Sequence, residues 1–489
     1  MRLRGFGRTW WVFLLLLARS GAVATGQGSG PTLPPGGDEP LPRLEVGGPT
    51  GLVTALAFSP DGNSLYEAGW DKVVRVWRRD AGSGAFGLDP RATYRVPIGP
   101  GTDGAINALA LSPDGTWLAV AGNGIVRGGA GFRRPGLMVP AAARTDAMRA
   151  DQGLIFIFNT RSEPRSVRLL RGHLGPVLSL EFVPGPAGQA PRLVSAARER
   201  DDLGVVRLWD VERGGLLDQG SIPLDPNASS SQTRPGLAAW PTGPGPSQLR
   251  VAIAWGDGQL RLWDVERDRG RPTAVGDGRF NNTVASFGGS SPLTGSLRDA
   301  QGRLTLWQRV AGAGEMPLAD AGRPIALAPP GDAPEAPRAL ALAPSRPGGS
   351  LDLAAVVVLR APGRVPGQGE AGLRLIDLNA GSWGIARARV DLWPVDLKQP
   401  TLPVLAVDPT GRSLAVSGND EREVWVFALA DILRGQPAPR PQRLRGAGEI
   451  IRRVGFVRSG PNLGLRLTGA AEDLILDPAR SRLSADRAG

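Results

Sequence analysis

The sequence predicts an all-β protein built from repeated four-stranded units, and three observations support this prediction. First, the heptapeptide RLWDVER stands at residues 207–213 and again at 261–267. Second, the turn sequence SPDG follows an alternating apolar run at 59–62 and at 112–115. Third, apolar residues alternate with a period of two along most of the chain, as in half-buried strands, whereas helical periodicity is nearly absent.

Each unit begins with an apolar strand that runs into a tight turn. Residues 53–62 read VTALAFSPDG, and residues 106–115 read INALALSPDG. In SPDG the proline fixes φ, while Asp and Gly tolerate the sharp reversal of the chain. A second apolar strand follows at 64–69 and at 116–122. The pattern therefore predicts antiparallel hairpins.

The third strand of each unit ends in a large apolar residue, and a looser fourth strand follows it. Aligning the chain on the tryptophan of RLWD gives eight such positions, mostly spaced by about 50 residues. They are Trp77, Phe158, Trp209, Trp263, Trp307, Ile376, Phe427 and Leu476. The alignment therefore predicts eight units.

These features resemble the WD-repeat β-propeller family. The resemblance rests on Gly172-His173, on the SPDG turns, and on the dipeptides Trp209-Asp210 and Trp263-Asp264. It implies a β-propeller of four-stranded antiparallel blades around a central channel, over residues 41–480. Eight units imply eight blades. Seven blades is the alternative, because the unit at 282–308 is short and weakly patterned.

The same resemblance implies a buried hydrogen-bonded set in the third unit, made of His173, Ser195, Asp202 and Trp209. A tryptophan Nε1–H only donates, so a buried tryptophan needs an acceptor such as a hydroxyl. In this interpretation Asp202 holds the imidazole, and the set is structural. The competing interpretation makes His173, the only histidine of the chain, a general base.

The N-terminal sequence predicts export to the periplasm, the cell envelope or the outside of the cell. Arginines precede the apolar run TWWVFLLLLA, and Ala22-Val23-Ala24 is a cleavage site, so residues 1–24 are expected to be a signal peptide. An uncleaved segment, the alternative, would be the chain's one contact with a membrane. Residues 25–40 are expected to be a disordered Gly/Pro-rich tether, and residues 481–489 a disordered tail.

The segment before the first unit suggests how the propeller closes. Leu44–Val46 is a spare strand, and we expect it to complete the last blade. Pairing of the two ends of the chain in one blade would leave no open sheet edge.

Three long loops between second and third strands are the candidate partner-binding region. They span residues 124–152, 197–202 and about 360–371, and in a propeller such loops emerge on one face. Tolerated drift in length is the competing explanation. The candidate residues are arginines, namely Arg127, Arg133, Arg134, Arg144, Arg149, Arg198, Arg200 and Arg364.

Composition excludes several kinds of chemistry. The chain has no cysteine and one histidine, so disulfides, zinc–thiolate sites and multi-histidine metal sites are excluded. It contains no GxSxG motif and no P-loop. We therefore expect no catalytic residue, no metal and no cofactor. The acidic residues Asp201, Asp202, Asp420, Glu421 and Glu423 are interpreted as exposed turn carboxylates.

The net charge of +11 is carried almost wholly by arginine, since Lys72 and Lys398 are the only lysines. We interpret these arginines as scattered over outward strand positions, which disfavours a nucleic-acid site. A nucleic-acid or anionic-surface binder remains a third hypothesis, and it would require a steep dependence of binding on salt.

The sequence thus predicts an exported, monomeric interaction scaffold that binds a protein or peptide with carboxylate groups. The alternative is a propeller hydrolase or lactonase with a carboxylate site in the channel. An exposed tryptophan would mark a binding anchor, and packing is the default interpretation of a buried one. The tryptophans to be placed are Trp70, Trp117, Trp240, Trp255, Trp383, Trp393 and Trp425, of which Trp425 is expected on the strand face opposite Phe427.

Overall fold

The structure is a computed structural model that describes most of the chain from residue 47 to residue 485. The described residues are 47–97, 101–124, 152–162, 166–185, 189–200, 202–224, 234–243, 245, 247–255, 258–280, 293–298, 303–308, 323–326, 335–344, 351–360, 368–377, 388–396, 403–418, 422–434, 439–445, 453–459, 462–468, 473–477 and 482–485. In the strands between 275 and 326 and beyond 453, the backbone alone is described. The expected signal peptide, tether and closing strand Leu44–Val46 lie outside the described residues.

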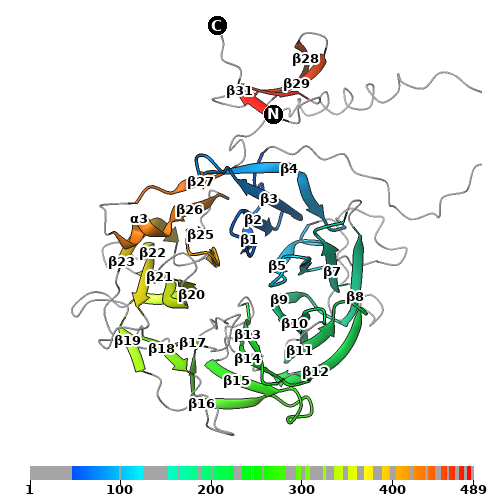
Figure 1. The fold of residues 1–489 in the computed structure, drawn as a ribbon, viewed down its shortest axis with the longest axis vertical. Coiled ribbons are helices and arrows are strands. Elements are labelled where there is room, and N and C mark those ends of the chain that lie inside the picture. The colour runs from blue at the N-terminus through cyan, green and yellow to red at the C-terminus, as the bar shows by residue number, and fades with distance from the viewer. Residues whose placement is uncertain are drawn as a thin grey trace, which may run out of the picture. The chain divides into compact units, whose positions relative to one another are not determined.

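The described strands form antiparallel sheets, numbered here one to eight in chain order (Figure 1). Sheet one contains β1 (Val53–Phe58), β2 (Ser64–Gly69), β3 (Val73–Arg79) and β4 (Phe86–Arg95). Sheet two contains β5 (Ile106–Leu111), β6 (Trp117–Gly122), β7 (Gly153–Asn159) and β8 (Val167–His173). Sheet three contains β9 (Val177–Val183), β10 (Arg192–Arg200), β11 (Leu203–Asp210) and β12 (Gly215–Pro223). Sheet four contains β13 (Gly236–Pro241), β14 (Leu249–Ala254), β15 (Gly258–Asp264) and β16 (Thr273–Phe280).

The second half of the chain repeats this order. Sheet five contains β17 (Leu293–Arg298), β18 (Arg303–Gln308) and β19 (Arg323–Ala326). Sheet six contains β20 (Glu335–Pro344), β21 (Leu351–Arg360), β22 (Gln368–Asp377) and β23 (Ala388–Asp396). Sheet seven contains β24 (Val404–Val407), β25 (Ser413–Ser417), β26 (Val424–Ala428) and β27 (Gln442–Leu444), with the short helix α3 (Leu429–Leu433) after β26. Sheet eight contains β28 (Arg453–Ser459), β29 (Asn462–Thr468), β30 (Asp473–Asp477) and β31 (Arg482–Ala485).

Each sheet is a simple meander in which neighbouring strands follow one another in the sequence. In sheet one, β1 pairs with β2, β2 with β3, and β3 with β4, always antiparallel. The predicted all-β fold of four-stranded antiparallel sheets is therefore confirmed, and sheet five, with three described strands, departs from the full count.

The SPDG turns have the conformation that their sequence predicts. Ser59 N–H donates to Ser64 O at 2.8 Å, and Gly62 N–H donates to Ser59 O at 2.8 Å. Gly62 has a φ of 65°, in the left-handed region that glycine adopts without a Cβ clash. The turn thus reverses the chain between β1 and β2.

Neighbouring sheets share hydrophobic cores, so most strands are buried on both faces. One core joins sheets one and two, the next joins two and three, and a third joins three and four. Another core joins six and seven. This explains why residues 353–359 of β21 are all buried, without alternation.

A further core joins sheet seven directly to sheet one. It contains Val53 and Trp77 from sheet one and Ala415 and Val426 from sheet seven. Eight sheets agree with the eight repeat units. The direct packing of sheet one on sheet seven agrees with the alternative count of seven blades, because an eighth blade in the closed series would separate them.

The end of the chain differs from the expectation of a disordered tail over 481–489. Residues 482–485 form β31, which pairs with β30 through Leu476 and Leu483. Sheet eight therefore obtains its fourth strand from the C-terminal part of the chain. The predicted pairing of Leu44–Val46 with the last blade falls outside the described residues and stays a prediction.

The interpretation of the arginines as outward strand residues is wrong for one recurring position. Arg75, Arg207, Arg261 and Arg374 lie two residues before the large apolar residue of the third strand, and each is buried. Because neighbouring sheets cover both faces of a strand, a polar residue at this position points into the molecule and needs partners there.

Among the described residues, no helix has both the length and the apolar character needed to cross a lipid bilayer.

Candidate functional site

His173, Ser195 and Trp209 meet at the boundary between sheets two and three. His173 ends β8, while Ser195 and Trp209 lie on the neighbouring strands β10 and β11. The imidazole Nε2 lies 2.7 Å from Ser195 Oγ, and Trp209 Nε1–H donates to the same Oγ at 2.7 Å. His173 and Ser195 are fully buried. The three side chains therefore form one hydrogen-bonded chain between two sheets.

Glu199, and not Asp202, holds the imidazole. Glu199 Oε1 lies 3.2 Å from His173 Nδ1 and accepts the backbone N–H of Leu174 at 3.3 Å. The side chain of Asp202 is 64% exposed, and its nearest charged partner is Arg200 at 3.7 Å. The prediction that Asp202 holds the imidazole is wrong, because Glu199 occupies that role. The register of β10 and β11 shifts between Arg198 and Arg200, and this bulge directs Glu199 toward the histidine.

The hydrogen bonds of this set are all donated in the same direction, from Trp209 through Ser195 and His173 to Glu199. Trp209 Nε1–H donates to Ser195, and the ionised Glu199 accepts from His173 Nδ1–H. A neutral imidazole then has Nε2 free to accept the Ser195 hydroxyl proton. The side chains of Trp209, Ser195 and His173 therefore all have hydrogen-bond partners while the imidazole is neutral.

Electrostatics support the neutral imidazole. Burial lowers the pKa of His173 from 6.5 to about 4, against the opposing hydrogen bond to Glu199. Burial alone would raise the pKa of Glu199, but the hydrogen bond with His173 and the charge of Arg207 outweigh it and lower that pKa. Arg207 Nη1 lies 3.0 Å from Glu199 Oε1. The carboxylate therefore stays charged and pairs with the guanidinium.

The order serine, histidine, glutamate has the connectivity of a nucleophile with its base and orienting acid. Here the serine is 0% exposed, and its oxygen already accepts a proton from Trp209. Both the hydroxyl and the imidazole are buried between two sheets, so the set can fix the spacing of these sheets.

Sheet one contains a different polar set at the equivalent place. Trp77 Nε1–H donates to Glu67 Oε2 at 3.3 Å, so a carboxylate occupies the position that Ser195 has in sheet three. Arg75 Nη1 lies 2.6 Å from Asp71 Oδ2 and 3.6 Å from Glu67 Oε1. Asp71 also accepts the backbone N–H of Thr50 at 3.0 Å. These contacts tie the turn after β2 to the segment before β1.

The buried arginines were missed in the sequence because RLWD was interpreted only through its tryptophan. Arg374 donates through Nε to Glu335 Oε2 at 2.9 Å and also contacts Glu335 Oε1 through Nη2. Arg207 pairs with Glu199, and Arg75 pairs with Asp71. The sequence signal for these buried arginines was an arginine repeated two residues before the large apolar residue of the third strand. Alternate residues of a strand share a face, so this arginine faces the same side as the buried apolar residue.

The first strands of sheets one, two and three all begin at one edge of the structure. Thr54 Oγ1, at the start of β1, donates to Ile106 O at the start of β5 at 2.6 Å. Asn107 Nδ2, on β5, lies 3.5 Å from Val177 O at the start of β9. We call this side the start edge, and the side carrying the SPDG turns the turn edge.

The loops between second and third strands emerge at the start edge. The turn after β2 is fixed by Trp70 N–H, which donates to Leu52 O at 2.9 Å just before β1. The end of β10 lies beside the start of β9, where Arg198 N–H donates to Pro176 O at 3.4 Å. Two loops of the class predicted to bind a partner thus lie on the same side.

Among the described residues, Trp70 is an exposed aromatic residue at the start edge. Its side chain is 49% exposed, whereas Trp240, Trp255, Trp393 and Trp425 are buried. Trp117 is partly buried, and Trp383 lies outside the described residues. Trp425 packs at 5.3 Å from the Trp393 ring, so packing on sheet six accounts for it. The expectation that Trp425 lies on the face opposite Phe427 is wrong, because residues two apart on a strand share a face, and the two rings belong to the same core.

Two of the candidate arginines lie in the described part of the chain. Arg198 is partly buried near the end of β10, and the side chain of Arg200 is 63% exposed at the start edge. The other six fall outside the described residues, and their role stays a prediction. They are Arg127, Arg133, Arg134, Arg144, Arg149 and Arg364. Within the described residues, no group of three or more histidine, aspartate or glutamate residues has the arrangement to hold a metal ion.

Comparison with known proteins finds similarity to WD-repeat proteins. The family model "WD domain, G-beta repeat" matches residues 41–78 and 93–127. Nuclear distribution protein PAC1 of Arthroderma otae is 29% identical over 154 residues, which is 29% of this chain and 30% of that protein. The chain thus matches less than a third of the length of this curated relative.

Among solved structures, a structure of U3-55K and a crystal structure of RRP9 WD40 repeats are similar to this chain. Each alignment covers 82% of this chain, with 97% and 96% of the respective solved chains, at 17% identity and a TM-score of 0.45.

Proposed function

Because the chain belongs to the WD-repeat β-propeller family, we propose that it is an interaction scaffold that binds a protein or peptide at the start edge. The exposure of Trp70 is the observation that carries this proposal. A half-exposed tryptophan leaves apolar surface in contact with water, and aromatic residues of this kind dominate binding free energy at interfaces.

The turn that presents Trp70 is held by contacts with two other segments of the chain, which supports a role in recognition. Asp71 accepts the N–H of Thr50, and Lys72 Nζ donates to Gly101 O at 2.9 Å. Lys72 has a φ of 69°, a conformation that these contacts have to stabilise. A side chain on a rigid support loses little conformational entropy when it binds.

The arginines favour a partner that carries carboxylates. Arg200 is exposed at the same edge as Trp70, and the six arginines of the long loops belong to the same loop class. Arginine binds carboxylates through paired hydrogen bonds, and the net charge of +11 adds a long-range attraction. We therefore propose an acidic protein segment as the partner and a monomer as the binding unit.

Affinity capture from cells tests this proposal. The parent, Trp70→Ala and the charge reversal Arg133→Glu/Arg134→Glu are each used as bait, and the captured proteins are quantified by mass spectrometry. We expect both variants to lose at least tenfold of the specific partner. Leu216→Ala and Arg213→Glu are the matched controls, because both residues are exposed outside the start edge. Equal capture by all five baits would refute recognition at this edge.

A hydrolase is the second candidate, because Ser195, His173 and Glu199 have the connectivity of a catalytic serine. A fluorophosphonate probe separates the two functions. The scaffold proposal predicts that the folded protein stays unlabelled at Ser195. Stoichiometric labelling that disappears in Ser195→Ala would support the hydrolase.

Export is the remaining part of the proposal, and it rests on the pattern of residues 1–24. Cell fractionation with sequencing of the mature N-terminus tests it. We expect the protein in the envelope or the medium, starting near Thr25 after cleavage. Recovery in the cytoplasm with Met1 intact would contradict it.

A further inference from the structure

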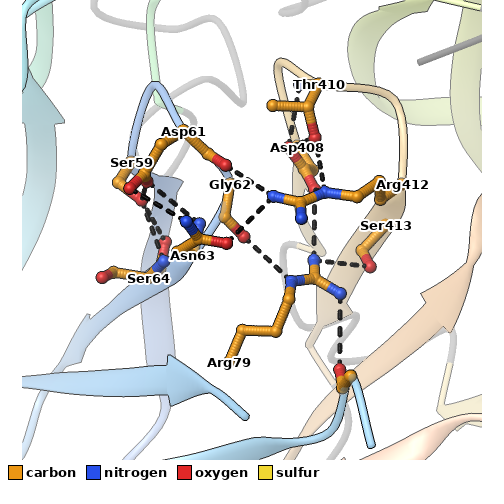
Figure 2. Close-up of polar contacts among 11 residues, drawn as sticks. Ser59, Asp61, Gly62, Asn63, Ser64, Arg79, Asp408, Thr410, Arg412 and Ser413 are labelled. Atoms are coloured by element: carbon orange, nitrogen blue, oxygen red, sulfur yellow. Dashed lines mark hydrogen bonds and ion pairs between the residues drawn. The ribbon is translucent and has the colours of Figure 1, made fainter. Parts of the chain in front are cut away.

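Sheets one and seven meet through a polar contact in addition to their shared core (Figure 2). Arg79, at the end of β3, donates through Nη2 to Asp408 Oδ2 at 3.1 Å and to Ser413 Oγ at 2.9 Å. Arg79 Nε donates to Gly62 O at 3.1 Å. The Asp408 side chain is 0% exposed and that of Arg79 is 12% exposed. A buried ion pair thus joins two segments that are 329 residues apart.

Asp408 occupies a position in a recurring turn where sheets one and two have a serine. In sheets one and two the turn begins with a serine, and Ser59 and Ser112 each donate to the aspartate two residues later at 2.5 Å. In sheet seven the acid comes first, and Thr410 Oγ1 donates back to Asp408 Oδ1 at 2.7 Å. The hydroxyl–carboxylate bond is kept, but the negative charge moves to the buried position.

The residue type at the position of Arg79 also differs between sheets. Arg79 lies two residues after Trp77, where sheets three and four have Val211 and Val265, both buried. Val265 shares a core with Val183, which occupies the turn position of Asp408 in the preceding sheet. The boundary between sheets three and four is therefore apolar where the boundary between seven and one is charged.

Sheet eight lacks the matching acid. Its first strand runs into residues 456–460, FVRSG, which align with residues 58–62, FSPDG. Val457 therefore takes the position of Asp408. An apolar residue there would leave the Arg79 guanidinium without its carboxylate, and a buried unpaired charge is strongly unfavourable.

Buried ion pairs add little net stability, but they discriminate between partners, because a mismatched surface leaves one charge uncompensated. We propose that the Arg79–Asp408 pair selects sheet seven as the partner of sheet one, and so closes the fold at seven sheets rather than eight. Neighbouring contacts reinforce the choice. Arg412 Nη2 donates to Asn63 Oδ1 at 3.1 Å, and Gln442 Nε2 donates to Phe86 O at 2.7 Å.

Chemical cross-linking of the full chain tests the proposal. Because the chain has no native cysteine, a maleimide reagent reacts with the introduced thiols and not with other thiols of the chain. Thr50→Cys and Arg422→Cys report closure at the start edge, away from the ion pair, because Arg422 Nη1 donates to Thr50 O at 2.8 Å. A short bis-maleimide should link the two thiols in nearly all parent molecules. The linked fraction is measured by mass spectrometry of tryptic peptides.

The decisive variant is Arg79→Val/Asp408→Val, which gives the boundary the apolar character of Val183 and Val265. We expect a melting temperature close to that of the parent and a linked fraction of less than half, since sheet one can then close on other sheets or chains. Asp408→Asn keeps the shape, leaves Arg79 unpaired, and should lower the melting temperature by about 5 °C. Arg250→Val/Asp264→Val, which removes an ion pair within sheet four, is the control and should link fully.

Full linking in the double variant would overturn the proposal, because the pair would then be dispensable for the choice of sheet. A low linked fraction in the control as well would also overturn it, because any lost ion pair would have the same effect.

Discussion

The buried imidazole of His173 makes the stability of the protein depend on pH. Burial places its folded pKa at about 4, below the ordinary value of 6.5. As the pH falls, the unfolded chain binds this proton first, so stability is lost from about pH 6.5 and the loss is complete near pH 4. Between pH 7 and pH 5 the free energy of unfolding should fall by about 2 kcal/mol.

Urea unfolding at pH 7 and at pH 5 measures this loss. His173→Gln is the control, because the chain then contains no imidazole and should show a flat profile over this range. Equal slopes in the parent and the variant would show that the histidine is not buried in its neutral form.

Gly62 has two reasons to be glycine, and they can be separated. Its φ is 65°, and a Cβ would lie 2.1 Å from Asp408 Oδ1. Gly115 in the equivalent turn has a φ of 72°, but its Cβ would meet only the Pro60 ring, at 3.2 Å from Cδ and 3.5 Å from Cγ. Thermal unfolding should show a loss of about 1–2 kcal/mol for Gly115→Ala and at least about 3 kcal/mol for Gly62→Ala. Equal losses would mean that Gly62 does not approach the acid.

At the scale of the strand pair β10–β11, the hydroxyl of Ser195 satisfies two buried groups. It accepts from Trp209 Nε1–H and lies 2.7 Å from His173 Nε2. Ser195→Ala should cost about 2–3 kcal/mol of unfolding free energy, because both partners stay buried without a mate. Ser83→Ala removes an exposed hydrogen bond to Asp80 and should cost less than about 0.5 kcal/mol in the same denaturation assay. A similar small cost for both would argue against a structural role of the set.

Strands and turns were predictable because their signals are local. Alternating apolar residues and Pro-Asp-Gly turns act within ten residues, so β1, β2, β5 and β6 were expected where they occur. That Glu199 and not Asp202 contacts His173 was not predictable, because a single-residue bulge shifts which side chains face inward. The strand β31 was missed because its four residues, RLSA, are too few to show an alternating apolar pattern, although the turn dipeptide Asp477-Pro478 precedes them.

At the scale of the whole molecule, the sequence predicted eight units and closure by Leu44–Val46, but it did not predict the packing of sheet one on sheet seven. Closure depends on Arg79 and Asp408, which are distant in the chain and lie in positions that look like ordinary strand and turn residues. The candidate site was located in part. The sequence predicted that loops between second and third strands bind a partner. It left open whether Trp70 packs in a core or contacts a partner, and the exposure of Trp70 favours contact with a partner.

The buried set of His173, Ser195 and Trp209 is structural, whereas the start edge binds the partner, and one comparison of binding affinities tests this division of roles. The partner recovered by affinity capture is purified and titrated at pH 7.5 by calorimetry into the parent, Ser195→Ala and Trp70→Ala. We expect a Kd within about twofold of the parent for Ser195→Ala and at least about tenfold weaker for Trp70→Ala. Loss of binding in Ser195→Ala with unchanged binding in Trp70→Ala would contradict it.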